Sequence, residues 1–261
     1  SHPQNNTRIQ RRGLQYPILW LLVGVMLEQV ARTWAERAQA ELGAAQRFKE
    51  LSERMQQVSG YTVPTVILRR VEKAEQDEDR HAFLCAKMAR KFGHETGFSL
   101  PQGRKRSVQM GWGNLGERDK LLLDVTMMGC ITESLNASLL NSIYSNAGGT
   151  EAGKLIHQIL KDEVQHAQIG WSYLAEECKA RDCSVVSKHL VEMVEYSLNE
   201  GFFLPMVNPI EENTYPYGVM SEKDRVGQFK TTLEEVVCTG FEHFGIDASP
   251  LRDWIENIFE A

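Results

Sequence analysis

The chain has 261 residues, of which 42% are hydrophobic and 25% are charged, a composition typical of a globular protein with a substantial core. Its formal net charge is −6, and its basic residues are scattered apart from the run Arg104-Lys105-Arg106, so the positive surface that nucleic-acid phosphates require is absent. The five cysteines are an odd number with no Cys-x-x-Cys pair, which favours reduced thiols in a cytoplasmic protein.

An apolar segment, PILWLLVGVML, occupies residues 17–27. It is shorter than the roughly 18 apolar residues that a membrane-spanning helix needs, and no small-residue cleavage site follows it. We therefore expect no integral membrane span. Residues 1–25 are predicted to form an N-terminal arm and the start of an apolar helix that docks on the protein or on a partner, with association at a membrane surface as the alternative.

The pattern of helix breakers predicts two helical pairs. Glycine and proline are scarce between 26 and 92 except in SGYTVP at 59–64, which indicates two long helices joined by a tight turn. A second pair is expected over about 117–146 and about 151–180, separated by NAGGT. The period-two alternation of strands is not sustained anywhere, so the fold class is predicted to be all-α.

Two antiparallel helical pairs joined by a long crossover are one way to build a four-helix bundle, which we expect over residues 26–182. Further helices are predicted at about 184–200, 221–244 and 248–260. We expect them to form a C-terminal extension, residues 183–261, that packs on the bundle.

A short motif occurs twice, as DEDRH at 77–81 and as DEVQH at 162–166. A Glu and a His three residues apart project from the same face of a helix. Apolar residues flank both pairs on that face, so both pairs are expected to point into the core. Buried carboxylates need a compensating partner, and a cation is the obvious one.

Hairpin symmetry identifies two further ligands. In an antiparallel pair, two residues at equal distances from the turn lie at the same height. The residue at the height of Glu163 in the second pair is next to Glu133, and the residue at the height of Glu78 in the first pair is Glu41. Glu41 also lies in an apolar stripe with helical spacing, whereas the competing Glu50 lies on a polar face.

Together these residues predict a centre for two metal ions. Its six ligands come from four helices: Glu41, Glu78, His81, Glu133, Glu163 and His166. Four carboxylates balance two divalent cations, and hard oxygen ligands with imidazole suit iron or manganese better than zinc. A ligand His must donate its second N–H, so Asp77 and Asp162 are predicted to accept from the His of the opposite motif.

This constellation resembles the ferritin-like diiron-carboxylate superfamily, which includes ferritins, rubrerythrins, the radical-generating subunit of ribonucleotide reductase and the hydroxylases of bacterial multicomponent monooxygenases. The resemblance covers about residues 26–180 and rests on the six predicted ligands. The Asp before each motif Glu is most similar to the oxygen-activating branch. The segments ELGAAQRF and DEDRHAFLC are similar to uncharacterised bacterial ferritin-like proteins.

Departures from these families narrow the function. Cys85 stands where the reductase subunit carries its radical Tyr, and Ala137 stands where the hydroxylases carry a Thr. Ile159 stands where the p-aminobenzoate N-oxygenase group, another member of the superfamily, carries an additional His. A stored tyrosyl radical at that position and a seventh ligand of that kind are therefore excluded. No catalytic residue beyond the metal ligands is identified.

The resemblance implies a non-haem diiron oxygenase or oxidase that uses O2 to oxidise a small organic molecule by hydroxylation, N-oxygenation or oxidative cleavage. It further implies two Fe ions, with Mn or a mixed Mn/Fe pair as alternatives, and an external electron donor such as a reductase or ferredoxin. A homodimer is compatible with this interpretation. The competing functions are a ferroxidase or iron-handling ferritin-like protein and a rubrerythrin-like peroxide scavenger.

The residues expected to line a substrate pocket are mostly apolar or small, which predicts a hydrophobic or aromatic substrate. An acyl chain whose polar end reaches the Arg104 to Arg106 loop is the alternative. The predicted pocket residues are Cys85, Met88, Thr126, Gly129, Cys130, Ala137 and Leu140.

Overall fold

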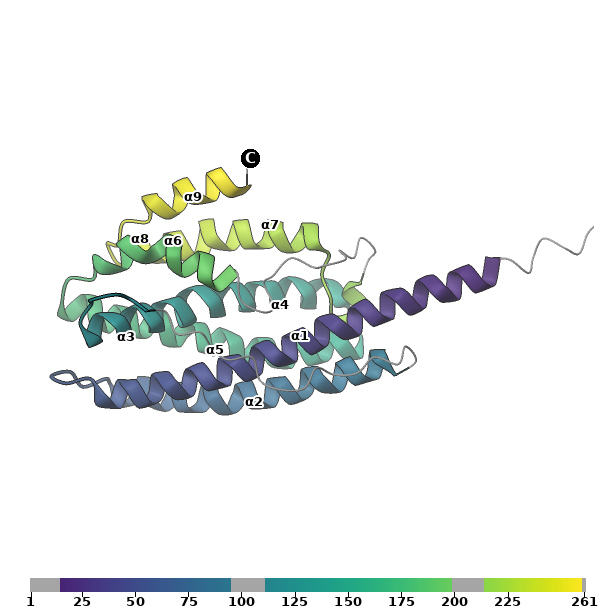
Figure 1. Ribbon diagram of the computed structural model, residues 1–261, viewed down its shortest axis with the longest axis horizontal. Helices are drawn as coiled ribbons and strands as arrows, with labels where there is room; N and C mark the ends of the chain where they lie inside the picture. The colour runs from purple at the N-terminus through teal and green to yellow at the C-terminus, as the bar shows by residue number, and fades with distance from the viewer. Residues whose placement is uncertain (1–14, 95–110, 199–213, 260–261) are drawn as a thin grey trace, which may run out of the picture.

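The computed structural model describes residues 15–94, 111–198 and 214–259, with side chains from residue 24 onward. Within these ranges every regular element is a helix and no strand occurs (Figure 1). The prediction of an all-α protein is therefore confirmed.

The first helical pair consists of α1 (Gln15–Gln57) and α2 (Thr65–Gly93), which pack along one another. Gly60 adopts a φ of 73° in the connection, a left-handed conformation that glycine tolerates without steric cost. Pro64 stands immediately before the first turn of α2. Both helices and the turn between them lie where the sequence predicted them.

The second pair is also at its predicted place, but its first member is not a regular α-helix. It comprises α3 (Glu117–Val125), the π-helical segment η1 (Thr126–Thr132) and α4 (Glu133–Ala147) without a break. The returning helix is α5 (Glu151–Ala180), where the Thr150 hydroxyl accepts a hydrogen bond from Gly153 N at 3.1 Å and caps the first turn. The sequence did not predict the π-helical turn.

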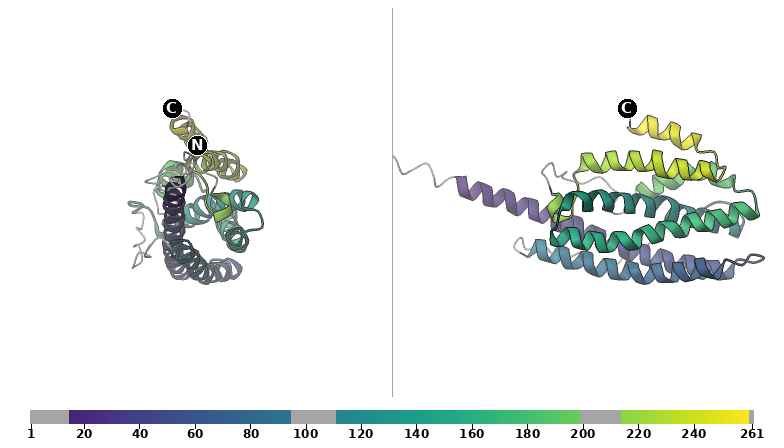
Figure 2. Two further views of the ribbon diagram at one scale, coloured as in Figure 1. Left: turned by 90° about the vertical axis from the view of Figure 1, so that its right-hand side faces the viewer. Right: turned by 180° about the vertical axis from the view of Figure 1, so that it is seen from behind.

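These four helical segments surround one core. α1 contacts α2, α2 contacts α5, and α5 contacts η1 and α4, while α3 closes the ring against α1. Figure 1 shows the long helices side by side, and the left view of Figure 2 looks along them. Large side chains from all four segments are fully buried between them, including Trp34, Phe48, Met88, Leu121, Ile131, Leu135 and Tyr173.

The C-terminal part adds helices outside this ring, close to their predicted positions. They are α6 (Val185–Leu198), the short 3₁₀ turn η3 (Tyr215–Tyr217), α7 (Glu222–Thr232), the π-helical segment η4 (Leu233–Cys238), α8 (Thr239–His243) and α9 (Ser249–Phe259). α6 packs on η1, α7 packs on α4, and α9 packs on α6 and η4. These helices cover the outer side of the chain segment that carries Glu133.

The N-terminal turns of α1 extend past the ends of the other helices (Figures 1 and 2). The apolar segment at 17–27 belongs to this part of α1, and Val25 is 50% exposed. Among the residues that the structure describes, no helix is long and apolar enough to cross a membrane. That this part of α1 docks on the protein or on a partner stays a prediction.

The bundle contains one very close helix crossing, between η1 and α5. A Cβ added at Gly129 would lie 2.5 Å from the Cα of Gly170, and one added at Gly170 would lie 2.5 Å from the backbone N of Cys130. The two glycines thus allow backbone-to-backbone contact in the turn that leads to Glu133. The missing side chain of Gly129 makes room for α5, and whether Gly129 also lines a substrate pocket stays a prediction.

We expect Gly170→Ala to lower the free energy of unfolding by about 1–3 kcal/mol, because the added methyl group forces the two backbones apart. The matched control is Gly227→Ala in α7, where an added Cβ meets no atom within 4 Å. That variant should be neutral or stabilising by up to about 1 kcal/mol. Urea denaturation of both variants measures the difference, and equal effects would contradict the close crossing.

Candidate metal centre

All six residues that the sequence predicted as ligands converge inside the ring of helices. Glu41 comes from α1, and Glu133 is the first residue of α4 after the π-helical segment. α2 and α5 each contribute one Glu and one His a turn apart. Each of the six is at most 4% exposed. The structure therefore gathers charged and polar side chains where water does not reach them.

The six side chains form two overlapping groups, each of which could hold a metal ion. Glu41 and His81 belong to the first group, Glu133 and His166 belong to the second, and Glu78 and Glu163 belong to both. In each group, one ligand atom from every residue lies within 4.8 Å of the others. The overlap would allow two neighbouring cation positions that share two carboxylates.

Two carboxylate oxygens at the centre are buried without a hydrogen bond among the described residues: Glu78 Oε1 and Glu163 Oε1. His166 Nδ1 lies 2.8 Å from Glu78 Oε1, and His81 Nδ1 lies 3.1 Å from Glu163 Oε1. Both are ion-pair contacts that lack the geometry of a hydrogen bond. A buried carboxylate oxygen that accepts no hydrogen bond costs free energy. Donor atoms that converge in this way fit a bound cation, which would satisfy both oxygens.

The two imidazole rings are oriented by the Asp residues of the opposite motifs. Nε2 of His81 lies 3.3 Å from Asp162 Oδ2, and Nε2 of His166 lies 3.4 Å from Asp77 Oδ2. Both rings therefore present Nδ1 to the carboxylates at the centre. This crossed pairing is the arrangement that the sequence predicted for the two aspartates.

The aspartates are in turn held by basic side chains that the sequence analysis did not assign. Arg80 donates to Asp77 Oδ1 at 2.8 Å and to Asp162 Oδ2 at 2.6 Å, and Lys73 forms an ion pair with Asp77. Burial opposes ionisation of Asp77, but its contacts with His166, Lys73 and Arg80 outweigh burial and lower its pKa. Arg80 thus ties the two repeats of the motif together at the rim of the centre.

Without a metal, the pKa values of the four carboxyl groups shift in opposite directions, two upward and two downward. Burial raises the pKa of Glu41 and of Glu133 well above the usual range, and the neighbouring Glu78 and Glu163 raise it further. Burial also opposes ionisation of Glu78 and Glu163, but contacts with the imidazoles outweigh it and lower both pKa values. These shifts favour the protonated form of Glu41 and Glu133 and the charged form of Glu78 and Glu163.

The imidazoles are protonated in the same state. Burial opposes a charge on His81, but its contacts with Glu163 and Glu78 prevail and raise its pKa to about 11. The pKa of His166 rises in the same way through Asp77, Glu163 and Glu78, again against its burial. Protons thus supply the positive charge that two cations would supply in a loaded centre.

Sequence reasoning also missed Arg37, a buried arginine near the centre. It stands one helical turn before Glu41 on α1 and is 1% exposed. Its Nη1 donates to the carbonyl of Gly218 at 3.4 Å, and its guanidinium lies 4.5 Å from the centroid of the Trp34 ring. An Arg within one turn of a predicted ligand, beside an aromatic residue of the same stripe, was the signal that could have revealed it.

The predicted pocket residues are mostly closed off by packing. Cys85, Met88, Thr126 and Leu140 are at most 1% exposed, and the Thr126 hydroxyl has no hydrogen-bond partner among the described residues. Ala137 is partly exposed on α4. That these five line a substrate pocket stays a prediction.

Cys130 differs from that group, as Gly129 does. Its backbone lies against Gly170, and burial and Cys178, near the end of α5, raise the pKa of its thiol. The extra residue of a π-helical turn rotates the residues that precede Glu133. A phase count based on a regular α-helix does not hold across this turn, so the assignment of Gly129 and Cys130 to the pocket stays a prediction.

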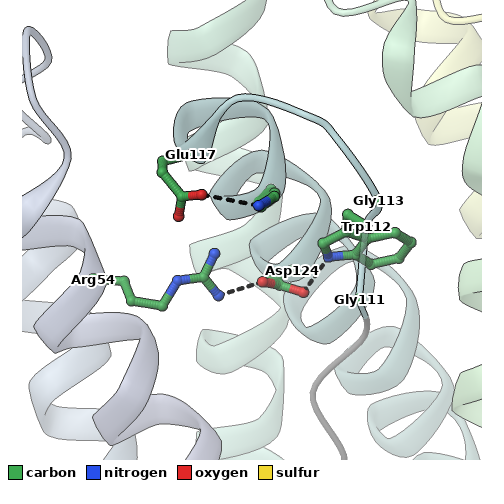
Figure 3. Close-up of a pocket in the computed structure, with 7 residues that line it drawn as sticks. Arg54, Gly111, Trp112, Gly113, Glu117 and Asp124 are labelled. Carbon is green, nitrogen blue, oxygen red and sulfur yellow. Dashed lines mark hydrogen bonds and ion pairs between the residues drawn. The ribbon is translucent and has the colours of Figure 1, made fainter.

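A polar cavity of about 320 Å³ lies at a different place, between α1 and the start of α3 (Figure 3). Arg54 forms an ion pair with Asp124 across it, and Trp112 Nε1 donates to Asp124 Oδ1 at 2.6 Å. None of its lining residues belongs to the predicted pocket, and its charged groups are already paired with one another. The loop with Arg104 to Arg106, which was expected to meet a polar substrate end, lies outside the described residues.

No protein-family model matches the chain, and no curated protein or solved structure matches it.

Metal affinity should rise steeply with pH, because ligands must lose their protons before they bind cations. Two imidazolium groups and two carboxyl groups hold those protons in the metal-free protein, so loading two ions should release up to about four protons at neutral pH. Calorimetric titration with Mn(II) in two buffers of different ionisation enthalpy counts them. Heats that do not depend on the buffer would contradict this charge distribution.

The contact between Asp162 and His81 should strengthen metal binding. Replacing Asp162 by Ala removes the acceptor for Nε2 and should weaken metal affinity about 10–100-fold while leaving the fold intact. Asp79→Ala, at an exposed position of the motif copy that carries His81, is the matched control and should leave affinity unchanged. Equal affinity of both variants in a competition assay with a metal-binding dye would show that the contact has no such role.

Proposed function

We propose that the four helical segments form a ferritin-like bundle around a carboxylate-bridged centre for two iron ions, and that the protein is an O2-dependent oxidase or oxygenase. The observation that carries the proposal is the pair of overlapping ligand groups that share Glu78 and Glu163. Four Glu and two His from four helices, with Glu-x-x-His on two of them, are the inward set of dimetal carboxylate proteins.

The donor chemistry supports iron or manganese as the resident metal. Each position offers carboxylate oxygens with one imidazole nitrogen, and four carboxylates neutralise two divalent cations in a core that water does not reach. Two iron ions, when bound, supply the electrons that reduce O2 and the oxidising power that acts on a substrate. An external donor such as a reductase or ferredoxin would restore those electrons.

The residues of the chain supply position and a dry environment. Asp77 and Asp162 hold the imidazole rings so that each Nδ1 faces the metal position. The Phe48 ring meets His166 edge-on, with ring centroids 5.4 Å apart, and shields that side. Burial raises the pKa of Cys85 well above its usual range, which keeps the thiol neutral one turn from His81. These features favour oxidation chemistry that excludes water.

The side chains near the ligands on α2 and α4 suggest the class of substrate. Cys85, Met88 and Leu140 are apolar or neutral and lie within one or two turns of the ligands on their helices. We therefore propose a small hydrophobic or aromatic substrate that is hydroxylated, N-oxygenated or oxidatively cleaved.

The first test is the metal count together with oxygen reactivity. Protein loaded anaerobically with Fe(II) should hold about two irons per chain and consume O2 with a transient absorption change in the visible range. Glu133→Gln and Glu163→Gln should lose at least one iron and the absorption change, because each removes an anionic ligand. Glu50→Gln, whose side chain accepts from Gln46 outside the centre, is the control.

Full iron content and unchanged O2 consumption in both ligand variants would refute this centre. Particle size tests the function separately from the centre. Assembly into a large hollow shell that mineralises iron would place the protein among iron-storage proteins instead, since storage requires such a cavity, whereas an oxygenase needs only a small assembly.

A further inference from the structure

The two halves of the centre have different neighbours. On α1, Arg37 stands one turn before Glu41, and Phe48 stands two turns after it. The Phe48 ring contacts His166 of the second ligand group. α1 thus places a buried cation one turn from a ligand of the first position, whereas an uncharged ring contacts a ligand of the second.

Arg37 is fixed in this place by several contacts. Its guanidinium lies over the Trp34 ring and donates to Gly218, and Trp34 Nε1 donates to the Tyr217 carbonyl at 2.9 Å. Gly218 fits tightly there, since a Cβ at this residue would lie 2.5 Å from Trp34. α1 and the 3₁₀ turn η3 therefore hold the guanidinium in one position.

The charge of Arg37 acts on the first half of the centre. Burial lowers the pKa of Arg37, whereas Cys85, Glu41 and Glu163 raise it, so these are the acidic groups that its charge influences. Arginine remains protonated in proteins even when its pKa is lowered. A cation that binds beside Glu41 therefore meets a permanent positive charge through a medium that screens poorly.

We propose that Arg37 makes the Glu41–His81 position the weaker of the two metal positions, so that the ions load in a fixed order with the Glu133–His166 position first. The inference rests on the two-metal centre proposed above. Both positions share Glu78 and Glu163, and both imidazoles have an Asp partner, so neither feature separates them. Lys73 pairs with Asp77 in the second half, but its side chain is 64% exposed and its charge is screened by water. The buried Arg37 is therefore the cation that distinguishes the two halves.

The experiment is an anaerobic titration with Mn(II), followed by the electron paramagnetic resonance signal of the free ion. The wild-type protein should bind two ions in two resolved steps. Arg37→Gln should strengthen the weaker step by about tenfold or more and leave the tighter step unchanged, because it removes one charge near one position. Arg37→Lys keeps the charge and should keep both steps.

Further variants show whether the effect depends on the place of the charge and which binding step belongs to which position. Arg32→Gln removes the same charge from an exposed position of α1 and should change neither step. Glu41→Gln should abolish the weaker step, and Glu133→Gln should abolish the tighter one. These two variants test the order even if Arg37→Gln does not fold.

An unchanged weaker step in folded Arg37→Gln, or loss of the tighter step in Glu41→Gln, would overturn the order. Either result could occur in a protein that binds two irons and consumes O2, in which case the proposed function would stand. A wild-type protein that binds fewer than two Mn(II) or Fe(II) ions would instead overturn both proposals.

Discussion

The convergence of Glu41, Glu78, Glu133 and Glu163 in one helical core is the constraint on which the rest of this structure depends. Carboxylates that lose their water need protons, hydrogen bonds or cations in its place. In the metal-free chain, protons on Glu41, Glu133 and the two imidazoles meet that need. Two divalent cations would meet it with better geometry, because the donor atoms converge in two overlapping groups. The features around the centre are best understood as supports for these groups.

Those supports come from separate parts of the chain. Arg80 joins the two aspartates that orient the imidazoles, and the glycine crossing between η1 and α5 allows the helix that carries Glu133 to approach closely. The C-terminal helices cover the outer side of that same segment. Arg37, held between Trp34 and the turn at Gly218, adds a positive charge at one end only. Stability and the chemistry of the centre are thus built into the same contacts.

Much of this arrangement could be predicted from the sequence, because helix length, breakers and the repeated motif are local signals. The helices, the convergence of the six predicted ligands and the crossed contacts of Asp77 and Asp162 required only periodicity and hairpin symmetry. The π-helical turn before Glu133 has no such signal, since its extra residue depends on packing against α5 and α6. Gly129 and Cys130 were assigned to the pocket from regular α-helical spacing, which this turn interrupts, and their place in a pocket stays a prediction.

The measurement that tests the central claim most directly is anomalous X-ray diffraction from crystals of the protein grown with Fe(II) or Mn(II). We expect two anomalous peaks per chain, both in contact with Glu78 and Glu163, one beside His81 and the other beside His166. A single peak, or none with the carboxyl groups paired to one another by shared protons, would contradict the interpretation that this core is built around two metal ions.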